Sequence, residues 1–382
     1  MLSRVATKTI NRTKPTHGLG FSVSFPAMRG IQAGREFYVI MCPLRYLPRL
    51  FLFDEEDVPA ELRAQRALNR NRVPGLARYV LDNREDYVFS ALTASVDGKL
   101  GFESSDPSDL NTQRLGILNI PMDAKFLIND GQHRRAAIEE ALKEDPSLGE
   151  ETLPIVIFAD EGLSRSQQMF ADLNRHAVRP AKSIGVLYDH RDDDSGIARL
   201  VVMRSDFFRG VVEMERSSLS ARSRKLFTLS ALYNATQSLL AGLQYEDLET
   251  AANKARDYWE LVSDQFPVWQ EVRAGRISAG DVRTEFIHSH GIALHALGRA
   301  GNTLLLKCEE PRTWLKAVEG LSKIDWSRAN VELWEGRAMV GGRVSKSSNN
   351  VILTTNVIRQ HMGLPLSPEE QRIEDAYRKG RA

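Results

Sequence analysis

The stretch Phe126-Leu-Ile-Asn-Asp-Gly-Gln-His-Arg-Arg135 passes from an apolar strand pattern, through a glycine, into a helix that we expect to end near Lys143. Gly131 can adopt the backbone angles that a sharp strand-to-helix turn requires. The first amides of a helix lack an intrahelical acceptor and lie at the positive end of its dipole, so they attract anions such as phosphate. His133 and Arg134 add donors in the first turn. The sequence therefore predicts an anion site here.

The phase of this helix directs His133 and Arg134 toward its buried side. Each lies about one turn before a residue of the apolar stripe, which contains Ala137 and Ile138. Cations oppose the dipole at a helix N-terminus, and a bound anion would remove this conflict. The alternative is that these side chains pair with a carboxylate such as Asp130, or reach solvent, and bind no ligand.

Strand and helix patterns alternate around this turn. The hydrophobic periodicity predicts two strands within residues 21–42 and further strands at 87–95, 99–102, 117–120, 125–128 and 153–159. Asp97-Gly98 predicts a hairpin turn between the strands at 87–95 and 99–102. Proline in the first turn and an N-cap serine predict three further helices, at 60–69, 74–81 and 165–174.

Beyond about residue 200 the pattern is mostly helical, with predicted helices at 226–240, 246–265, 284–297 and 312–321. The sequence thus predicts an α+β protein of two domains. The first domain spans residues 1–205 and contains the glycine turn. The second domain, residues 206–382, is mainly helical and is the candidate DNA-binding part.

The composition excludes several classes of protein. Of the 382 residues, 42% are hydrophobic and 26% are charged, which is typical of a globular protein and rules out wholesale disorder. The apolar runs are too short to cross a bilayer. Cys42 and Cys308 are the only cysteines, so a disulfide scaffold and a cysteine-built zinc site are excluded. We expect a cytoplasmic protein with no membrane partner. His288 and His290 have poor ligand spacing on a helix, so we predict no metal site.

The net charge of +1 conceals an uneven distribution. Residues 1–35 and 336–361 contain basic side chains and no acid, and residues 199–225 also carry an excess of basic side chains. Such segregation permits a basic face that binds phosphates. The alternative is a set of separate solvated surfaces.

Two segments have the residue types that hold a DNA backbone, namely cations with serine hydroxyls or flexible glycines. We expect each arginine lost from 216–225 to weaken DNA binding. The slope with which the affinity falls as salt increases should also become smaller. A solvated basic surface is the alternative for both segments, and no helix-turn-helix is evident. The candidates are Arg216, Ser218, Arg222, Arg224 and Lys225 in the first segment and Arg337, Arg343 and Lys346 in the second.

The turn Asp130-Gly-Gln-His-Arg134, followed by Ala136-Ala-Ile138, resembles the DGQHR-domain proteins, above all the DndB family of bacterial DNA phosphorothioation systems. Other landmarks of that family occur in order along most of the chain. They are Gln65-Arg-Ala-Leu-Asn69 with Arg72-Val73 before Tyr79, Phe170-Ala-Asp-Leu-Asn174, Ser217-Ser-Leu-Ser-Ala-Arg-Ser-Arg224, and Leu353-Thr-Thr-Asn-Val357 before Gly363-Leu-Pro365.

The resemblance implies a ParB/sulfiredoxin-like N-terminal domain, in which a strand, a glycine turn and a helix N-terminus bind nucleotide phosphates. Gln132 stands where sulfiredoxins have their catalytic cysteine, and a glutamine cannot act as that nucleophile. Asn174 either lines the same cleft or caps a helix. The implied phosphate-binding residues are Asp130, Gly131, Gln132, His133, Arg134 and Asn174.

The resemblance further implies a DNA-binding transcriptional repressor of a phosphorothioate-modification operon. Such a protein binds double-stranded promoter DNA as a homo-oligomer. One alternative is a nucleotide hydrolase that uses Asp130, His133 and Arg134 with a nucleoside triphosphate and Mg²⁺. In that case we expect Arg134→Ala to lose nucleotide affinity with little loss of folding. Another alternative is a non-enzymatic assembly factor that contacts the DNA sulfur-modification enzymes.

Overall fold

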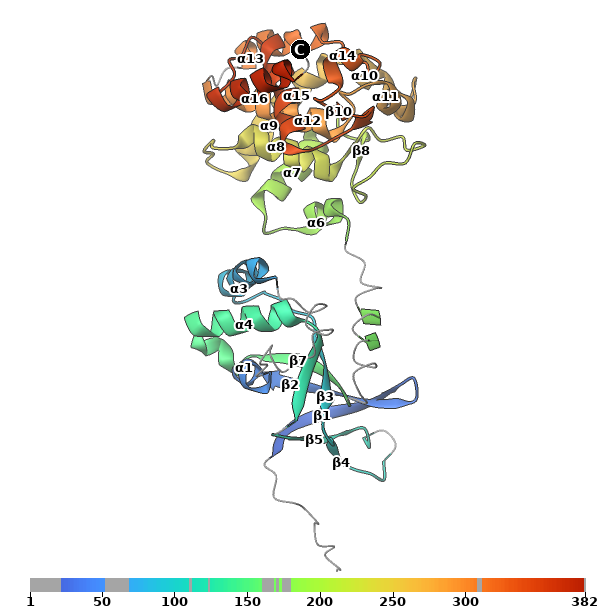
Figure 1. Cartoon of the computed structure of the whole chain (residues 1–382), viewed down its shortest axis with the longest axis vertical. Helices are drawn as coiled ribbons and strands as arrows, with labels where there is room; N and C mark the ends of the chain where they lie inside the picture. The colour runs from blue at the N-terminus through green and yellow to red at the C-terminus, as the bar shows by residue number, and fades with distance from the viewer. Residues whose placement is uncertain are drawn as a thin grey trace, which may run out of the picture. The chain divides into compact units, whose positions relative to one another are not determined.

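The computed structural model describes residues 22–51, 69–109, 112–122, 124–159, 168–169, 172–173, 180–307 and 311–380. The chain divides into two compact units, Met1–Val178 and Arg179–Ala382, and Figure 1 shows a sheet with helices in the first and mostly helices in the second. The predicted α+β fold is therefore confirmed.

The sheet of the first unit has seven strands in the order β4-β5-β1-β2-β7-β3-β6. Its neighbours are antiparallel, except that β3 and β7 run parallel. The strands are β1 (Ser22–Gln32), β2 (Arg35–Pro43), β3 (Leu92–Asp97), β4 (Gly101–Ser104), β5 (Leu115–Pro121), β6 (Lys125–Asp130) and β7 (Thr152–Ala159).

The hairpin predicted at Asp97-Gly98 is wrong. β3 pairs with β6 and β7, whereas β4 pairs with β5. The reason is burial: Leu92, Ala94 and Val96 are all inaccessible to solvent, so β3 belongs in the sheet interior with both of its edges paired. β4 alternates between exposed and half-buried residues, which suits a strand at the sheet edge.

Two helices of the first unit lie side by side against the sheet (Figure 1), α3 (Val73–Asp82) and α4 (Gln132–Glu144). Buried alanines and branched residues of both helices join the core formed by the strands. The predicted helix at 60–69, except Asn69, and most of the one at 165–174 lie outside the described residues. The shorter helices are η1 (Leu44–Tyr46), α1 (Leu47–Leu50), η3 (Arg70–Arg72) and η4 (Pro146–Glu150).

The second unit begins with two helices that lie within residues 1–205, the range predicted for the first domain. These are α6 (Lys182–Tyr188) and α7 (Asp193–Arg204), and their residues Val186, Ile197 and Val201 belong to the core of the second unit. The remaining helices are α8 (Leu229–Leu240), α9 (Leu248–Asp264), α10 (Pro267–Arg273), α11 (Ala279–Glu285), α12 (Gly291–Lys307), α13 (Pro311–Val318), η5 (Glu319–Lys323), α14 (Val331–Trp334), α15 (Ser348–His361) and α16 (Pro368–Lys379).

One predicted helix, 284–297, is two helices in the structure. The chain between α11 and α12 becomes extended at Phe286, which pairs with Ser327 in an isolated β-bridge. The Ile287 amide then donates to the Trp326 carbonyl. These tertiary hydrogen bonds replace the helical ones, and they reorient the chain before α12.

The centre of the second unit is an aromatic core with a tight helix pair. Phe207 and Phe227 pack on Trp269 with ring centroids 5.3 and 5.0 Å apart. Beside it, α8 and α12 approach closely, because a Cβ at Gly298 would lie only 2.1 Å from the Ala235 carbonyl oxygen. Two short ladders complete the unit: β8 (Val212–Glu213) with β9 (Phe227–Thr228), and β10 (Met339–Val340) with β11 (Arg343–Val344).

Candidate functional site

The predicted strand–glycine–helix turn joins β6 to α4. Gly131 has φ of 102°, in the left-handed region. A Cβ here would lie 2.3 Å from Leu92 Cδ2. Both the backbone angle and the available space therefore require glycine.

The Arg134 guanidinium folds back across this turn. Its Nη2 lies 2.7 Å from Asp130 Oδ2, and its Nη1 donates to the Ser90 carbonyl oxygen at 3.0 Å. The Arg134 side chain is only 16% exposed, against 49% for Asp130. Arg134 thus forms the internal ion pair that was the alternative to a ligand role. Part of its charge is neutralised, and it ties the segment before β3 to the turn.

His133 makes a different contact. Its Nε2 accepts the Asn69 backbone N–H at 3.1 Å, so in this arrangement the ring is neutral, with its proton on Nδ1. Burial, followed by the nearby charge of Arg72, lowers the pKa of His133. Asn69 and Arg72 belong to another of the family landmarks, so the fold brings two distant landmarks together.

Among the residues that the structure describes, no side chain caps the first turn of α4. Gly131 supplies no side-chain cap, and the helical hydrogen bonds begin with the Arg135 amide, which donates to the Gly131 carbonyl at 2.9 Å. Gln132 turns its amide group toward the Ile128 carbonyl, at 3.4 Å. The turn therefore offers backbone donors and a neutral imidazole. Asn174, the remaining candidate of this site, lies outside the described residues.

In the second unit, the segment 216–225 is a loop whose backbone is held in place from two sides. The Arg283 guanidinium of α11 donates to the carbonyl oxygens of Ser220, at 2.7 Å, and Lys225. At the other end, the Ser183 amide and hydroxyl bond to the Ser217 hydroxyl and the Arg216 carbonyl, both at 3.0 Å. Sequence reasoning missed Arg283 and Ser183, because an isolated arginine and serine carry no motif.

The cations of this loop divide into two kinds. Arg216, Arg222 and Arg224 are exposed, as is Ser218. Lys225 instead donates to the Gly210 carbonyl at 2.6 Å and so helps to fix the loop. The loop therefore presents three arginines from a backbone that other groups hold.

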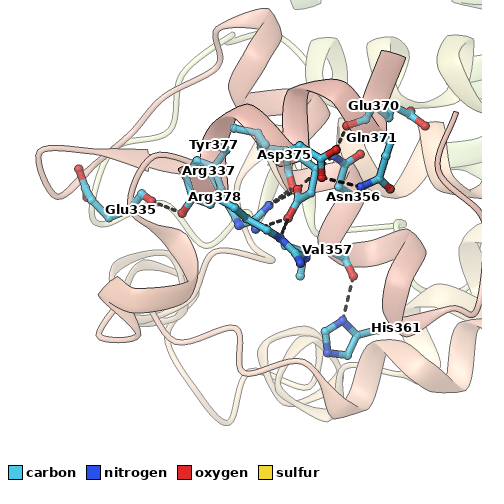
Figure 2. Close-up of polar contacts among 12 residues, drawn as sticks. Glu335, Arg337, Asn356, Val357, His361, Glu370, Gln371, Asp375, Tyr377 and Arg378 are labelled. Carbon is cyan, nitrogen blue, oxygen red and sulfur yellow. Dashed lines mark hydrogen bonds and ion pairs between the residues drawn. The ribbon is translucent and has the colours of Figure 1, made fainter. Parts of the chain in front are cut away.

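The assignment of Arg337 to DNA binding is corrected by the structure (Figure 2). Its side chain is 9% exposed and forms a bidentate pair with Glu374, at 2.8 and 2.6 Å. The guanidinium also lies 4.3 Å from the centroid of the Tyr377 ring. Asn356 donates to the same carboxylate. Arg337 is a buried cation that fastens α16 to its unit, and DNA phosphates cannot reach it.

The other candidates of that segment are at the surface. Arg343 and Lys346 are exposed, and Arg328 connects their hairpin to α11 by donating to the carbonyls of Gly342 and Thr284, at 3.1 and 3.2 Å. Since α11 also carries Arg283, the fold joins the two basic segments through one helix. The sequence alone gave no sign of this connection.

The paired histidines after α11 have packing roles. His288 Nδ1 accepts the Trp269 indole N–H at 2.9 Å, and His290 Nε2 lies 2.7 Å from the Arg283 carbonyl oxygen. Burial, together with the neighbouring His290, lowers the pKa of His288 to about 3. Burial also dominates at His290 and lowers its pKa to about 4. Within the described ranges, no cluster of candidate metal ligands occurs, and no helix could cross a membrane.

The structure thus defines an α+β protein with a glycine turn at a helix N-terminus and a helical unit that presents arginines. Residues 25–365 match the model of the DndB family, described as DNA-sulfur modification-associated. The match covers nearly the whole chain, which therefore belongs to the DndB family and is associated with DNA sulfur modification. No curated protein and no solved structure matches the chain significantly.

Proposed function

We propose that this protein is a DNA-binding transcriptional regulator that represses a DNA phosphorothioate-modification operon. Membership of the DndB family supports the pathway. The observation that carries DNA binding is the loop 216–225, whose backbone is bonded to Arg283 while its own arginines stay exposed. The protein binds double-stranded promoter DNA as a homo-oligomer, and repeated half-sites match such symmetry.

The physical argument is preorganisation. A loop that is already ordered loses less conformational freedom when it binds. Exposed arginines can each grip two oxygens of a backbone phosphate. The backbone at the start of the loop is also fixed by Glu213, whose carboxylate accepts the backbone amides of Glu215 and Arg216, at 3.1 and 3.3 Å.

The test is the triple variant Arg216→Ala, Arg222→Ala, Arg224→Ala, with affinity for a fluorescent promoter duplex measured over a range of salt. We expect affinity to fall at least about tenfold, with a salt slope lower by about 0.9 for each phosphate that the variant no longer neutralises. The matched control replaces three exposed arginines outside both segments, Arg273, Arg312 and Arg372. A folded triple variant with unchanged affinity and slope would contradict the proposal.

A second candidate function is nucleotide binding at the Gly131 turn. It is supported by the uncapped first turn of α4 and by the Arg72 charge beside His133. The test is calorimetric titration with ATP and Mg²⁺, together with phosphate release, for wild type and Arg134→Ala. We expect the variant to lose nucleotide affinity, because Arg134 holds the turn through Asp130 and the Ser90 carbonyl. The control is Arg78→Ala, an exposed side chain on α3. Equal affinity in wild type and folded Arg134→Ala would count against this function.

A further inference from the structure

A second group of basic side chains gathers around α12 in the helical unit. It consists of Lys182, His295, Arg299 and Lys346, which we call the α12 cluster. His295 and Arg299 follow Gly291 by one and two helical turns, so all three positions share a face of α12. Lys182 comes from the first turn of α6, and Lys346 directly precedes the N-cap of α15.

Contacts place Lys346 and Lys182 near this face. A Cβ at Gly291 would lie 2.5 Å from Lys346 Nζ and 3.1 Å from the Ala231 Cβ of α8. The Lys346 ammonium therefore lies against the first turn of α12, although the side chain as a whole is exposed. Lys182 Nζ donates to Asn234 Oδ1 on α8 at 2.7 Å and lies 5.1 Å from the centroid of the Tyr233 ring.

Two members of the cluster have no internal partner. Among the residues that the structure describes, neither the Lys346 ammonium nor the His295 ring has a hydrogen-bond or ion-pair partner. Burial, followed by the charges of Arg299, Lys346 and Lys182, lowers the pKa of His295. Burial likewise lowers the pKa of Lys346. A partly buried cation without a counterion is unfavourable, and it is more so at the positive end of a helix dipole.

Neighbouring carboxylates only partly offset this charge. Glu370 lies 3.7 Å from Arg299, but it also pairs with Arg359 at 2.7 Å and accepts the Ser367 amide at 2.9 Å. Near Lys182, Asp192 is hydrogen-bonded to the Tyr233 hydroxyl, and the charges of Asp194 and Asp189 also act on that hydroxyl. At the other end of the cluster, Arg299 and Arg359 share one carboxylate. The excess of positive charge therefore lies at the Arg299 and Lys346 end, where the described residues give Lys346 no carboxylate partner.

We propose that the α12 cluster is a binding site for a phosphate group. Lys346 and His295 contact the phosphate oxygens, while Arg299 and Lys182 supply further charge from the flanks. A phosphate matches the site because its several oxygens can accept from ammonium and imidazole donors at once. The group comes either from a DNA backbone or from a small phosphorylated molecule. The inference does not depend on the loop 216–225 or on the repressor role.

The experiment measures two ligands with the full chain: pyrophosphate by calorimetry, and the promoter duplex by fluorescence anisotropy. Lys346→Ala is the principal variant, and Lys316→Ala on an exposed face of α13 is the matched control. We expect Lys346→Ala to weaken binding of at least one ligand by about tenfold or more, the effect of losing one charge-assisted hydrogen bond. His295→Asn gives a second variant, and thermal melting confirms that each one folds.

The outcomes separate the sources of the phosphate. Weaker pyrophosphate binding in Lys346→Ala identifies a small phosphorylated ligand, and weaker duplex binding alone identifies a backbone phosphate. Unchanged binding of both ligands, or no phosphate binding by wild type, overturns the site. A wild-type protein that binds pyrophosphate but no duplex removes the repressor proposal and leaves this site intact. In addition, bound pyrophosphate should raise the NMR-observed pKa of His295, with the resonance assigned from His295→Asn.

Discussion

In the first unit an arginine is used to hold its own turn, whereas in the helical unit the arginines of a loop stay exposed. At the Gly131 turn, Arg134 shapes the turn by pairing with Asp130 and the Ser90 carbonyl. In the helical unit, Arg283 shapes the loop 216–225, so the arginines of that loop remain exposed. The difference is whether the bonds that hold the backbone come from the segment's own arginine or from another element. In this protein, the arginines of the loop 216–225 stay exposed because another element holds the loop backbone, whereas Arg134 is consumed in holding its own turn.

The largest effect should come from an arginine whose charge is fully used inside the fold. We expect Arg337→Ala to destabilise the helical unit by about 3–5 kcal/mol, because buried Glu374 loses its bidentate partner and keeps only Arg378 and Asn356. Urea denaturation measures this loss. Arg343→Ala, on the exposed hairpin, should change stability by less than about 0.5 kcal/mol. Similar losses of stability in the two variants would contradict the distinction between the buried Arg337 and the exposed Arg343.

A smaller effect tests the steric demand of the Gly131 turn. Gly131→Ala places a methyl group against Leu92 in a left-handed backbone, and we expect a loss of about 2–4 kcal/mol from strain and overpacking together. Gly210→Ala is the control, since Gly210 has φ of 91° with nothing within 4 Å of the added Cβ. It should lose only the strain, about 1 kcal/mol. Chemical denaturation of both variants measures the difference, and equal losses would show that Leu92 does not limit the turn.

Acid should weaken the helical unit through its buried histidines. The folded pKa values of His288 and His290, about 3 and about 4, lie below their ordinary value of 6.5. Below pH 6.5 these histidines bind protons in the unfolded chain but not in the folded chain. Their contribution to the free energy of unfolding is therefore complete above pH 6.5 and falls as the pH approaches 4. Each histidine should contribute about 1 kcal/mol per pH unit within that window.

Urea midpoints from pH 7.5 to 4.5 measure this dependence. His288→Gln, which keeps an acceptor for the Trp269 indole, should flatten the slope. His133 of the first unit is only half-buried, so it serves as the comparison for the buried His288 of the helical unit. A variant with an unchanged slope would exclude His288 as its source.

A small effect on stability should come from Asp130→Asn. The ion pair with Arg134 is half exposed on the aspartate side, so its loss should change stability by less than about 1 kcal/mol. The released charge of Arg134 should, however, strengthen binding of ATP at the Gly131 turn. Calorimetry of wild type and variant measures both effects. If nucleotide affinity falls instead, the carboxylate itself takes part in binding.

The sequence predicted the parts of the fold that local pattern controls. The strand, glycine and helix around Gly131 were predicted because the periodicity changes at a residue that tolerates positive φ. The hairpin at Gly98 was wrong because Asp-Gly reports local turn propensity, whereas the pairing of β3 is decided by burial against β7. The break before α12 depends on hydrogen bonds to Trp326, which no local pattern reveals.

The site residues divide in the same way. Arg216, Arg222 and Arg224 were predicted to bind DNA from their residue type; the structure shows them exposed, and their role in DNA binding stays a prediction. Arg337 looked the same in the sequence but is buried, because Glu374, far along the chain, completes a bidentate pair with it. The role of Arg283 could not be predicted either, since it acts on main-chain carbonyls whose positions only the fold determines.

The parallel pairing of β3 with β7 has a consequence for biosynthesis. β6 carries the Gly131 turn at one edge of the sheet, and its neighbour β3 is held from the other side by β7. Because β7 is the last of these strands to leave the ribosome, the seven-stranded sheet is complete only after residue 159 has emerged. A nascent chain that stalls earlier would expose the edges of β2 and β3, which are prone to aggregation.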